Sequence, residues 1–306
     1  MNNTIKGMII FATTVERGSM AAAAQDLNIS SSAISQQISK LEQDMQINLL
    51  HRSTRNLTLT EAGRIFYESC IKIIAMAEHT QQLLNELRET PLGELRIATP
   101  VGFAGSGLLS EPLKNLIHNH SQLKINLMIQ DGTIDIISER VDLALCIGPL
   151  PDSNLVARHL VDWDLILCAS PAYLKHAGIA SAGDITEPEQ LKSLDWLSHT
   201  YSQQGELIFT GSNGKKLPVN FLSKMKVNNM QALIQFTQDG LGFAALPEPE
   251  IRQALKQGSL IRLVPDWSLP KFSVYAVTPT RDAQPAKVRT AIDILNHYLR
   301  NLPPLL

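Results

Sequence analysis

The sequence predicts an α/β protein whose helical N-terminal part leads, through one long helix, into alternating strands and helices. Three observations support this fold class: short segments with helical apolar spacing up to Met45, one unbroken helical pattern over Thr60–Glu89, and alternating strand-like and helix-like segments from Glu94 onward. The chain has 306 residues, of which 44% are hydrophobic and 18% charged, so it can form packed cores in two or three compact units.

Composition restricts the classes of partner. The net charge is −2, and residues 1–59 are only weakly basic, so any affinity for nucleic acid must come from a local patch that dimerisation repeats. Cys70, Cys146 and Cys168 are far apart and odd in number, which indicates reduced thiols in a cytoplasmic protein and leaves a redox role for one of them open. The N-terminus lacks a signal-peptide pattern, and no apolar run is long enough to cross a membrane.

Residues 4–45 predict three helices. The first covers Thr4–Arg17 with Thr4 as its cap, the alanine-rich second covers Met20–Leu27, and the third follows the capping residue Ser30. The third helix has an apolar face and a polar face, formed respectively by Ile34, Ile38, Leu41 and Met45 and by Ser31, Ser32, Ser35, Gln36, Ser39 and Lys40. This pattern fits a helix that enters the major groove of DNA, and the periodicity alone fits an ordinary amphipathic helix with a solvated face equally well.

A resemblance to a known protein family favours the interpretation as a DNA-binding helix. Phe11–Tyr67 resembles the N-terminal domain of LysR-type transcriptional regulators through three ordered motifs: GSMAAAA, SxSAxSxQIxxLE and LLxRSTRxxxLTEAG. The resemblance implies a winged helix-turn-helix whose polar face meets DNA. Family members often carry Gln and Pro where Ser31 and Ser32 stand and Arg where Gln36 stands. The base preference is therefore open, because Arg prefers guanine and Gln prefers adenine.

His51–Leu59 predicts a small β-hairpin that forms the wing of this domain. Arg52 and Arg55 are expected on its loop. Surface arginines are usually only solvated, but the resemblance implies that these two contact DNA. Contacts to phosphate position a protein without reading sequence, and they make binding dependent on salt.

Thr60–Glu89 predicts one helix that ends before Pro91. Apolar and small residues follow a heptad spacing along it: Leu59, Gly63, Phe66, Cys70, Ile73, Ala77, Thr80, Leu84 and Leu87. A helix of this length exceeds what one small domain can cover, so we expect two chains to pair along residues 59–87. The family likewise uses this segment as a linker and dimerisation helix, and its members commonly form tetramers.

The remainder predicts two α/β lobes. A βαβαβ order indicates a parallel sheet, with strands Glu94–Thr99, Lys124–Gln130 and Asp142–Ile147 and helices Leu108–Asn119 and Gly132–Arg140. Two lobes joined by two crossings resemble the effector domain of the same family, which is built like periplasmic solute-binding proteins. The expected domains are residues 1–60 (winged helix-turn-helix), 61–90 (linker and dimerisation helix) and 91–306 (effector binding). Lobe I covers about 91–162 and 266–306, and lobe II about 163–265.

A ligand is expected beyond the carboxyl ends of the strands, where two helices also begin. Free N–H groups at helix starts favour an anion, so the sequence predicts a small carboxylate as effector. The expected contacts are Thr99, Pro100, Val101, Gly102 and Asn228, with Ile147 and Leu246 as apolar walls. For Thr99 and Asn228 the alternative is simple helix capping without any ligand.

The sequence contains no recognisable group of catalytic residues, metal ligands or cofactor-binding residues. The eight histidines lack metal-ligand spacing, and Gly102-x-x-Gly105-x-Gly107 matches neither the dinucleotide fingerprint nor the Walker pattern. The expected function is therefore a DNA-binding transcriptional regulator, not an enzyme, whose partners are duplex DNA, a small-molecule effector, further copies of itself and RNA polymerase, without a membrane. The alternatives are an enzyme with an appended helix-turn-helix, as in biotin ligases, and a DNA-binding regulator that needs no ligand.

Overall fold

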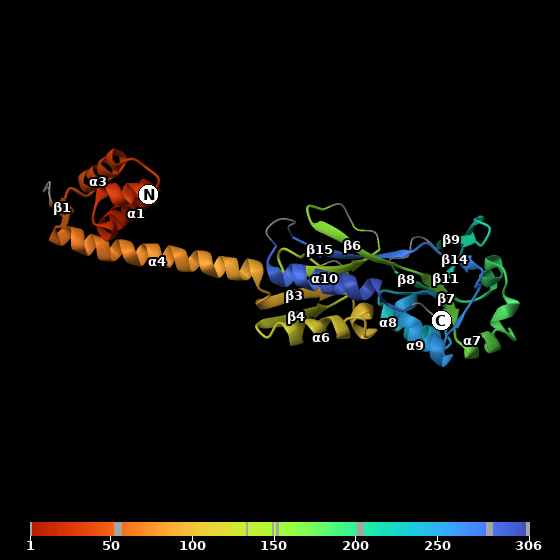
Figure 1. Ribbon diagram of the computed structural model, residues 1–306. Coiled ribbons are helices and arrows are strands. Elements are labelled where there is room, and N and C mark those ends of the chain that lie inside the picture. The colour runs from red at the N-terminus through yellow and green to blue at the C-terminus, as the bar shows by residue number, and fades with distance from the viewer. Residues whose placement is uncertain are drawn as a thin grey trace. The chain divides into compact units, whose positions relative to one another are not determined.

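The computed structural model describes residues 2–51, 57–132, 134–148, 150, 153–200, 205–279 and 284–303 (Figure 1). The chain forms two compact units, Met1–Glu86 and Leu87–Leu306. Helix α4 (Glu61–Glu89) contains the boundary between them. Within the described residues, no helix combines the length and the apolar character that crossing a membrane requires.

Three helices of the N-terminal unit pack around one apolar core: α1 (Asn2–Arg17), α2 (Met20–Asp26) and α3 (Ser31–Met45). The apolar face predicted for α3 points into this core, because Ile34, Ile38 and Leu41 are buried in the same cluster as Phe11. The predicted cap at Thr4 is wrong, since α1 already begins at Asn2. Strand β1 (Leu50–His51) pairs antiparallel with β2 (Thr58–Leu59) and so forms the base of a hairpin.

The surroundings of α4 change along its length. Thr60 caps the first turn by accepting the Gly63 N–H on its Oγ1 at 2.9 Å. Gly63 and Cys70 are buried and Phe66 is half-buried. The N-terminal half of the surface along which two chains were predicted to pair therefore packs inside its own chain. Ile74 is half-buried against the same core, whereas five large apolar residues further along the other side of the helix are exposed to solvent. We call these residues, 73, 76, 83, 84 and 87, the distal stripe.

Lobe I of the C-terminal unit is a five-stranded sheet in the order β4-β3-β5-β15-β6. Its strands are β3 (Gly93–Thr99), β4 (Leu123–Ile129), β5 (Leu143–Ile147), β6 (Val156–Trp163) and β15 (Phe272–Thr278). β4, β3 and β5 are parallel as predicted, whereas β15 is antiparallel to both β5 and β6, so the sheet is mixed. Helices α6 (Ser110–Asn119) and α10 (Ala286–Arg300) share an apolar cluster with the strands and cover one face.

The predicted helix Gly132–Arg140 is wrong, because residues 136–140 form a single turn. Asp135 caps the start of this turn, since its Oδ1 accepts the N–H groups of Ile137 and Ser138 at 3.1 Å each. Arg140 then adopts a positive φ of 53° and directs the chain into β5. Strand β6, which was not expected, pairs with β15 along its whole length.

Lobe II contains a five-stranded sheet in the order β11-β8-β12-β7-β13 and a smaller one in the order β10-β9-β14. The strands of the larger sheet are β7 (Leu165–Ala169), β8 (Trp196–His199), β11 (Ser223–Val227), β12 (Phe243–Pro247) and β13 (Ile261–Arg262). The smaller sheet consists of β9 (Glu206–Gly211), β10 (Lys216–Asn220) and β14 (Trp267–Ser268). The helices are α7 (Pro171–His176), α8 (Met230–Gln238) and α9 (Glu248–Gln257).

The chain passes between the lobes twice. The first crossing lies at Asp164, between β6 and β7. The second lies at residues 269–271, because β14 still pairs with β9 of lobe II before β15 enters the sheet of lobe I. Lobe II therefore extends a few residues beyond the expected limit at residue 265.

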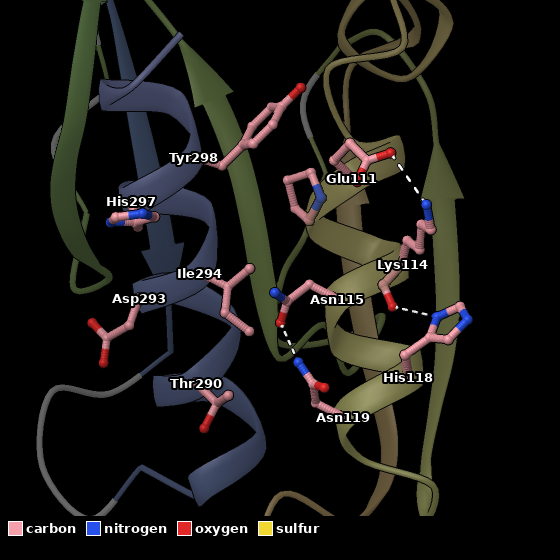
Figure 2. A pocket seen from close by; sticks show the side chains of 11 residues that line it. Glu111, Lys114, Asn115, His118, Asn119, Thr290, Asp293, Ile294, His297 and Tyr298 are labelled. Atoms are coloured by element: carbon pink, nitrogen blue, oxygen red, sulfur yellow. Dashed lines mark hydrogen bonds and ion pairs between the residues drawn. The ribbon is translucent and has the colours of Figure 1, made fainter.

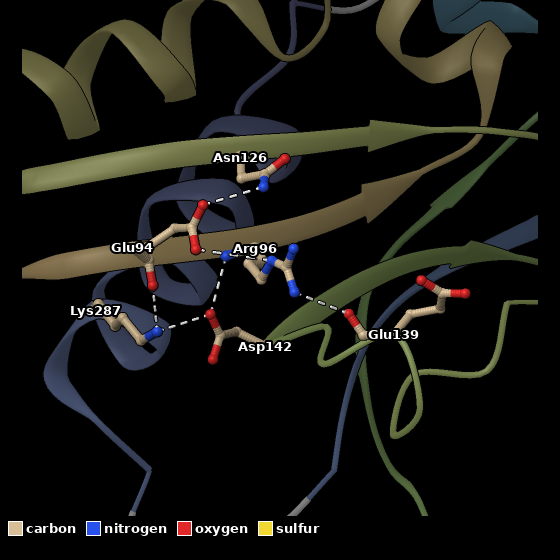
Figure 3. Close-up of polar contacts among 6 residues, drawn as sticks. All are labelled: Glu94, Arg96, Asn126, Glu139, Asp142 and Lys287. Carbon is tan, nitrogen blue, oxygen red and sulfur yellow. Dashed lines mark hydrogen bonds and ion pairs between the residues drawn. The ribbon is translucent and has the colours of Figure 1, made fainter.

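A polar network ties α10 to the sheet of lobe I (Figure 3). Lys287 Nζ lies 2.7 Å from Asp142 Oδ2 and also donates to the carbonyl of Glu94. The same Asp142 oxygen accepts the backbone N–H of Arg96 at 2.9 Å. Nearby, Arg289 of α10 donates to the carbonyl of Arg88, in the last turn of α4, at 2.7 Å. The Arg289 contact ties the last turn of α4 to α10 of lobe I.

Candidate functional site

The polar face of α3 is fully presented to solvent. Ser30 caps the helix by accepting the Ala33 N–H on its Oγ at 3.1 Å, and Ser19 caps α2 in the same way through Ala22. With the apolar face buried, the six polar residues expected to meet DNA are all exposed: Ser31, Ser32, Ser35, Gln36, Ser39 and Lys40. Short side chains on an anchored helix suit contact with base edges and phosphates in the major groove.

The hairpin after α3 is fastened to that helix by one carboxylate. Glu42 Oε1 accepts the backbone N–H of Leu49 at 2.7 Å and that of Leu50 at 3.1 Å, at the start of β1. The base of the hairpin is therefore tied to α3. Arg52 and Arg55, the expected DNA contacts on its loop, lie outside the described residues.

Replacing Glu42 by alanine should weaken both the fold and any DNA binding of the N-terminal unit. Two buried or half-buried backbone N–H groups would lose their acceptor, which typically costs about 1–3 kcal/mol for a buried donor. Glu42→Gln keeps an acceptor oxygen at the same place and serves as the matched control. Urea unfolding of the full-length protein, followed by helical circular dichroism, should show an early transition for the alanine variant and little change for the glutamine variant.

In lobe I the residues expected to bind the effector cluster where β3 ends and the short helix α5 (Val101–Gly105) begins. Thr99 is only 2% exposed, and its Oγ1 has no hydrogen-bond partner among the described residues. Pro100 precedes α5 as its N-cap, and Ile147 is half-buried at the end of β5. Gly102 approaches lobe II so closely that a Cβ there would lie 2.6 Å from Glu250 Oε2 and 3.2 Å from Met230 Cβ.

Asp131, which follows β4, connects the two lobes. Its Oδ1 accepts the Val101 N–H of lobe I at 3.0 Å, and its Oδ2 accepts from Asn229 Nδ2 of lobe II at 2.5 Å. Asn229 is also the N-cap of α8, since its Oδ1 accepts the Ala232 N–H at 2.8 Å. One N–H group at the start of each helix, that of Val101 for α5 and that of Ala232 for α8, therefore already has an acceptor supplied by the chain.

Two further titratable side chains lie near Asp131. Burial, reinforced by the negative charge of Asp131, raises the pKa of Glu250 from 4.5 to about 7. Glu250 Oε2 is buried without a hydrogen-bond partner among the described residues. Burial lowers the pKa of His199, although the Asp131 charge and a hydrogen bond to the backbone of Asn228 oppose that shift.

Two of the expected effector contacts are placed differently by the structure. Asn228 is exposed, and the neighbouring Asn229 makes both the cap and the interlobe contact. Leu246 is fully buried in the core of lobe II, because β12 is the central strand of its sheet and α8 and α9 cover it. Glu250 and Asn229, which the sequence did not single out, lie in this interlobe cluster; the helix-start position of Asn229 was a usable signal, whereas Glu250 gave none.

A groove of about 740 Å³ runs between α6 and α10 of lobe I, away from this interlobe cluster (Figure 2). The polar side chains of α6 interact along their own helix: Lys114 Nζ lies 3.6 Å from Glu111, and the His118 ring contacts the Lys114 carbonyl at 2.8 Å. Asp293 of α10 pairs with Arg158 of β6 at 3.2 Å. Among the described residues, the polar side chains of the groove therefore do not point toward one common ligand position.

The three cysteines are free thiols. Burial raises the pKa of Cys70 to about 11 and that of Cys168 to about 12, and it also raises the pKa of the half-buried Cys146. A raised pKa keeps the thiol protonated near neutral pH and disfavours the reactive thiolate.

Two family models together match most of the chain. The model described as "Bacterial regulatory helix-turn-helix protein, lysR family" matches residues 5–64, and the model described as "LysR substrate binding domain" matches residues 88–300. The boundaries of these matches correspond to the helix-turn-helix and to the two-lobed part described above.

Curated relatives align along nearly the whole chain. The HTH-type transcriptional activator AaeR of Escherichia coli K12 is 32% identical over 294 residues, which cover 96% of this chain and 93% of the relative. The regulator DmlR of the same strain is 30% identical over 304 residues, covering 97% and 96%. The regulator PtxR of Pseudomonas aeruginosa is 29% identical over 293 residues, covering 96% and 92%.

Solved structures show the same architecture. The full-length Vibrio cholerae virulence activator AphB matches with a TM-score of 0.72 and 27% identity, covering 96% of this chain and 98% of that chain. CrgA from Neisseria meningitidis matches with a TM-score of 0.60 and 26% identity, covering 97% and 99%. The alternative of an enzyme with an appended helix-turn-helix finds no support in these similarities.

Proposed function

The chain belongs to the family of LysR-type transcriptional regulators, and we propose that α3 contacts base edges of a specific duplex sequence. Arg52 and Arg55 of the wing contact the phosphate backbone of the same duplex. The protein is a DNA-binding regulator with an effector-binding domain. The observation that supports our assignment of α3 is its divided surface: Ile34, Ile38 and Leu41 are buried, and the opposite polar face is exposed throughout. A second candidate is a regulator of the same kind that works without a ligand.

Gln36 and Arg55 should differ in what they contribute. Gln36→Ala should relax sequence preference, because a bidentate Gln–adenine contact is worth about 1–3 kcal/mol of discrimination. Arg55→Ala should weaken binding to all sequences alike and reduce the salt slope by about one, because it removes a phosphate contact. The measurement is fluorescence anisotropy on duplexes selected from a random pool and on scrambled ones, over a salt series. The same loss of discrimination in both variants would contradict the assignment.

A symmetric dimer, and by resemblance a tetramer, would present two α3 helices to successive turns of the duplex. The distal stripe of α4 supports this proposal, since Met76 is 68% and Leu84 61% exposed in the single chain. Pairing also explains how a chain with net charge −2 can bind DNA. We also propose that the protein contacts RNA polymerase and acts in the cytoplasm.

We further propose that a small molecule bound between the lobes shifts the population of two lobe arrangements and so changes the spacing of the paired α3 helices. A carboxylate, the class expected from the sequence, would have to replace Asp131 at the Val101 N–H, so its binding would compete with the bridge to Asn229. Calorimetry with a panel of small carboxylates tests the class. No heat from any member at millimolar concentration would remove it and favour the ligand-independent candidate.

A further inference from the structure

The contact between the lobes depends on an unusual pair of acids. Asp131 accepts hydrogen bonds from both lobes, and Glu250 on α9 faces α5 at the place where Gly102 leaves room for a carboxyl group. Glu250 Oε2 is buried and has no hydrogen-bond partner among the described residues. A buried carboxylate without a cation is costly, and here a second carboxylate makes it costlier.

The elements around this pair supply no compensating cation within the described residues. Helices α5 and α8 contain no titratable side chain. On α9, Arg252 is already paired with Glu248 through hydrogen bonds of 2.6 and 2.9 Å. His199, at the end of β8, is the remaining titratable group that interacts with Asp131, and burial favours its neutral form. Ionised Glu250 would therefore oppose Asp131 directly.

We propose that the contact between the lobes is gated by a proton on Glu250: the neutral carboxyl permits the lobes to close over the Asp131–Asn229 bridge, and ionisation opens them. The proposal rests on the proposed function only in treating the contact between the lobes as the regulatory element. It requires neither a DNA sequence nor an effector.

The direction follows from the two states of the carboxyl group. Glu250 titrates at about 7 in the closed arrangement and returns toward 4.5 when the lobes separate and water reaches it. The closed arrangement is fully favoured below the lower value and is lost progressively as pH rises through the higher one. Each pKa unit of difference changes the closing equilibrium about tenfold, so the whole change is of order a hundredfold.

Amide hydrogen exchange of the full-length protein, corrected for intrinsic rates, tests the proposal between pH 5 and 8.5. Peptides containing Val101–Gly105 and Met230–Gln238 should lose protection as pH rises toward 7, by up to about a hundredfold, and then level off. Glu250→Gln, which is neutral at every pH, should keep its protection throughout. Glu206→Gln, which removes an exposed carboxyl on β9 of the same lobe, is the matched control and should retain the wild-type profile.

Two further variants keep the test decisive. Asp131→Asn removes the charge that opposes ionised Glu250 and one of the two acceptor oxygens of the bridge. Protection should therefore be lower at every pH, and its pH-dependent loss should move to lower pH even if Glu250→Gln fails to fold. His199→Gln should leave the profile in place. A wild-type profile that is flat, or one that Glu250→Gln leaves unchanged, overturns the proposal. Failure to bind DNA would contradict the proposed function without changing this result, because the readout involves no DNA.

Discussion

Gly63→Ala should unfold the N-terminal unit and abolish DNA binding, although it adds only one methyl group. A Cβ at this position would lie 2.0 Å from the Leu49 carbonyl oxygen and 2.9 Å from its carbon. That carbonyl accepts the Thr60 N–H at 3.0 Å, so it cannot move away without breaking the junction between the hairpin and α4. Backbone overlap in a packed core places the expected loss of stability at about 4 kcal/mol or more.

The matched control is Gly7→Ala, which changes a helical glycine of α1 in the same unit. Its Cβ would lie 3.2 Å from Leu41 Cδ1, the end of a side chain that can adjust, and alanine favours helix by about 1 kcal/mol. Urea unfolding monitored by circular dichroism and a gel shift on a selected duplex measure both variants. Equal stability of the two variants would show that the Gly63 contact relaxes, contrary to our expectation.

The N-terminal unit was predictable because its determinants are local. Ile34, Ile38 and Leu41 follow helical spacing within one helix, and Ser30 stands directly before the helix it caps. The motif resemblance then assigned a function to the opposite face. The pairing surface predicted along residues 59–87 is reduced by the structure to its exposed part. A heptad pattern cannot distinguish apolar residues that pack in their own chain, such as Cys70, from residues left exposed, such as Leu84.

The interlobe cluster was harder to predict from the sequence because the residues that contact one another are far apart along the chain. Asp131 and Asn229 are separated by 98 positions, and neither carries a pattern that requires the other. Strand ends indicated where Thr99 and Val101 would lie in the fold, since parallel strands deliver their carboxyl ends to one edge, and their role in binding an effector stays a prediction. The interlobe contact is made by Asn229, the N-cap of α8, and not by the preceding Asn228.

Leu84→Glu should separate the dimer and lower affinity for a two-site duplex by about a hundredfold or more, because binding of the second half-site would no longer be intramolecular. The distal stripe offers five large apolar side chains, Ile73, Met76, Leu83, Leu84 and Leu87, each more than 40% exposed in the single chain. Pairing would bury Leu84 twice, once in each chain, and burying one leucine is worth about 1.5–3 kcal/mol. Facing glutamates would lose this term and repel each other.

Gln82→Glu places the same charge half a turn away, on the opposite side of α4, and is the matched control. Sedimentation velocity at micromolar protein should show a single chain for the Leu84 variant and the wild-type assembly for the Gln82 variant. Anisotropy on a duplex with one half-site should give similar affinities for both, because the polar face of α3 is untouched. If the Leu84 variant sediments as the wild type does, other surfaces hold the chains together and the distal stripe is not the dimer contact.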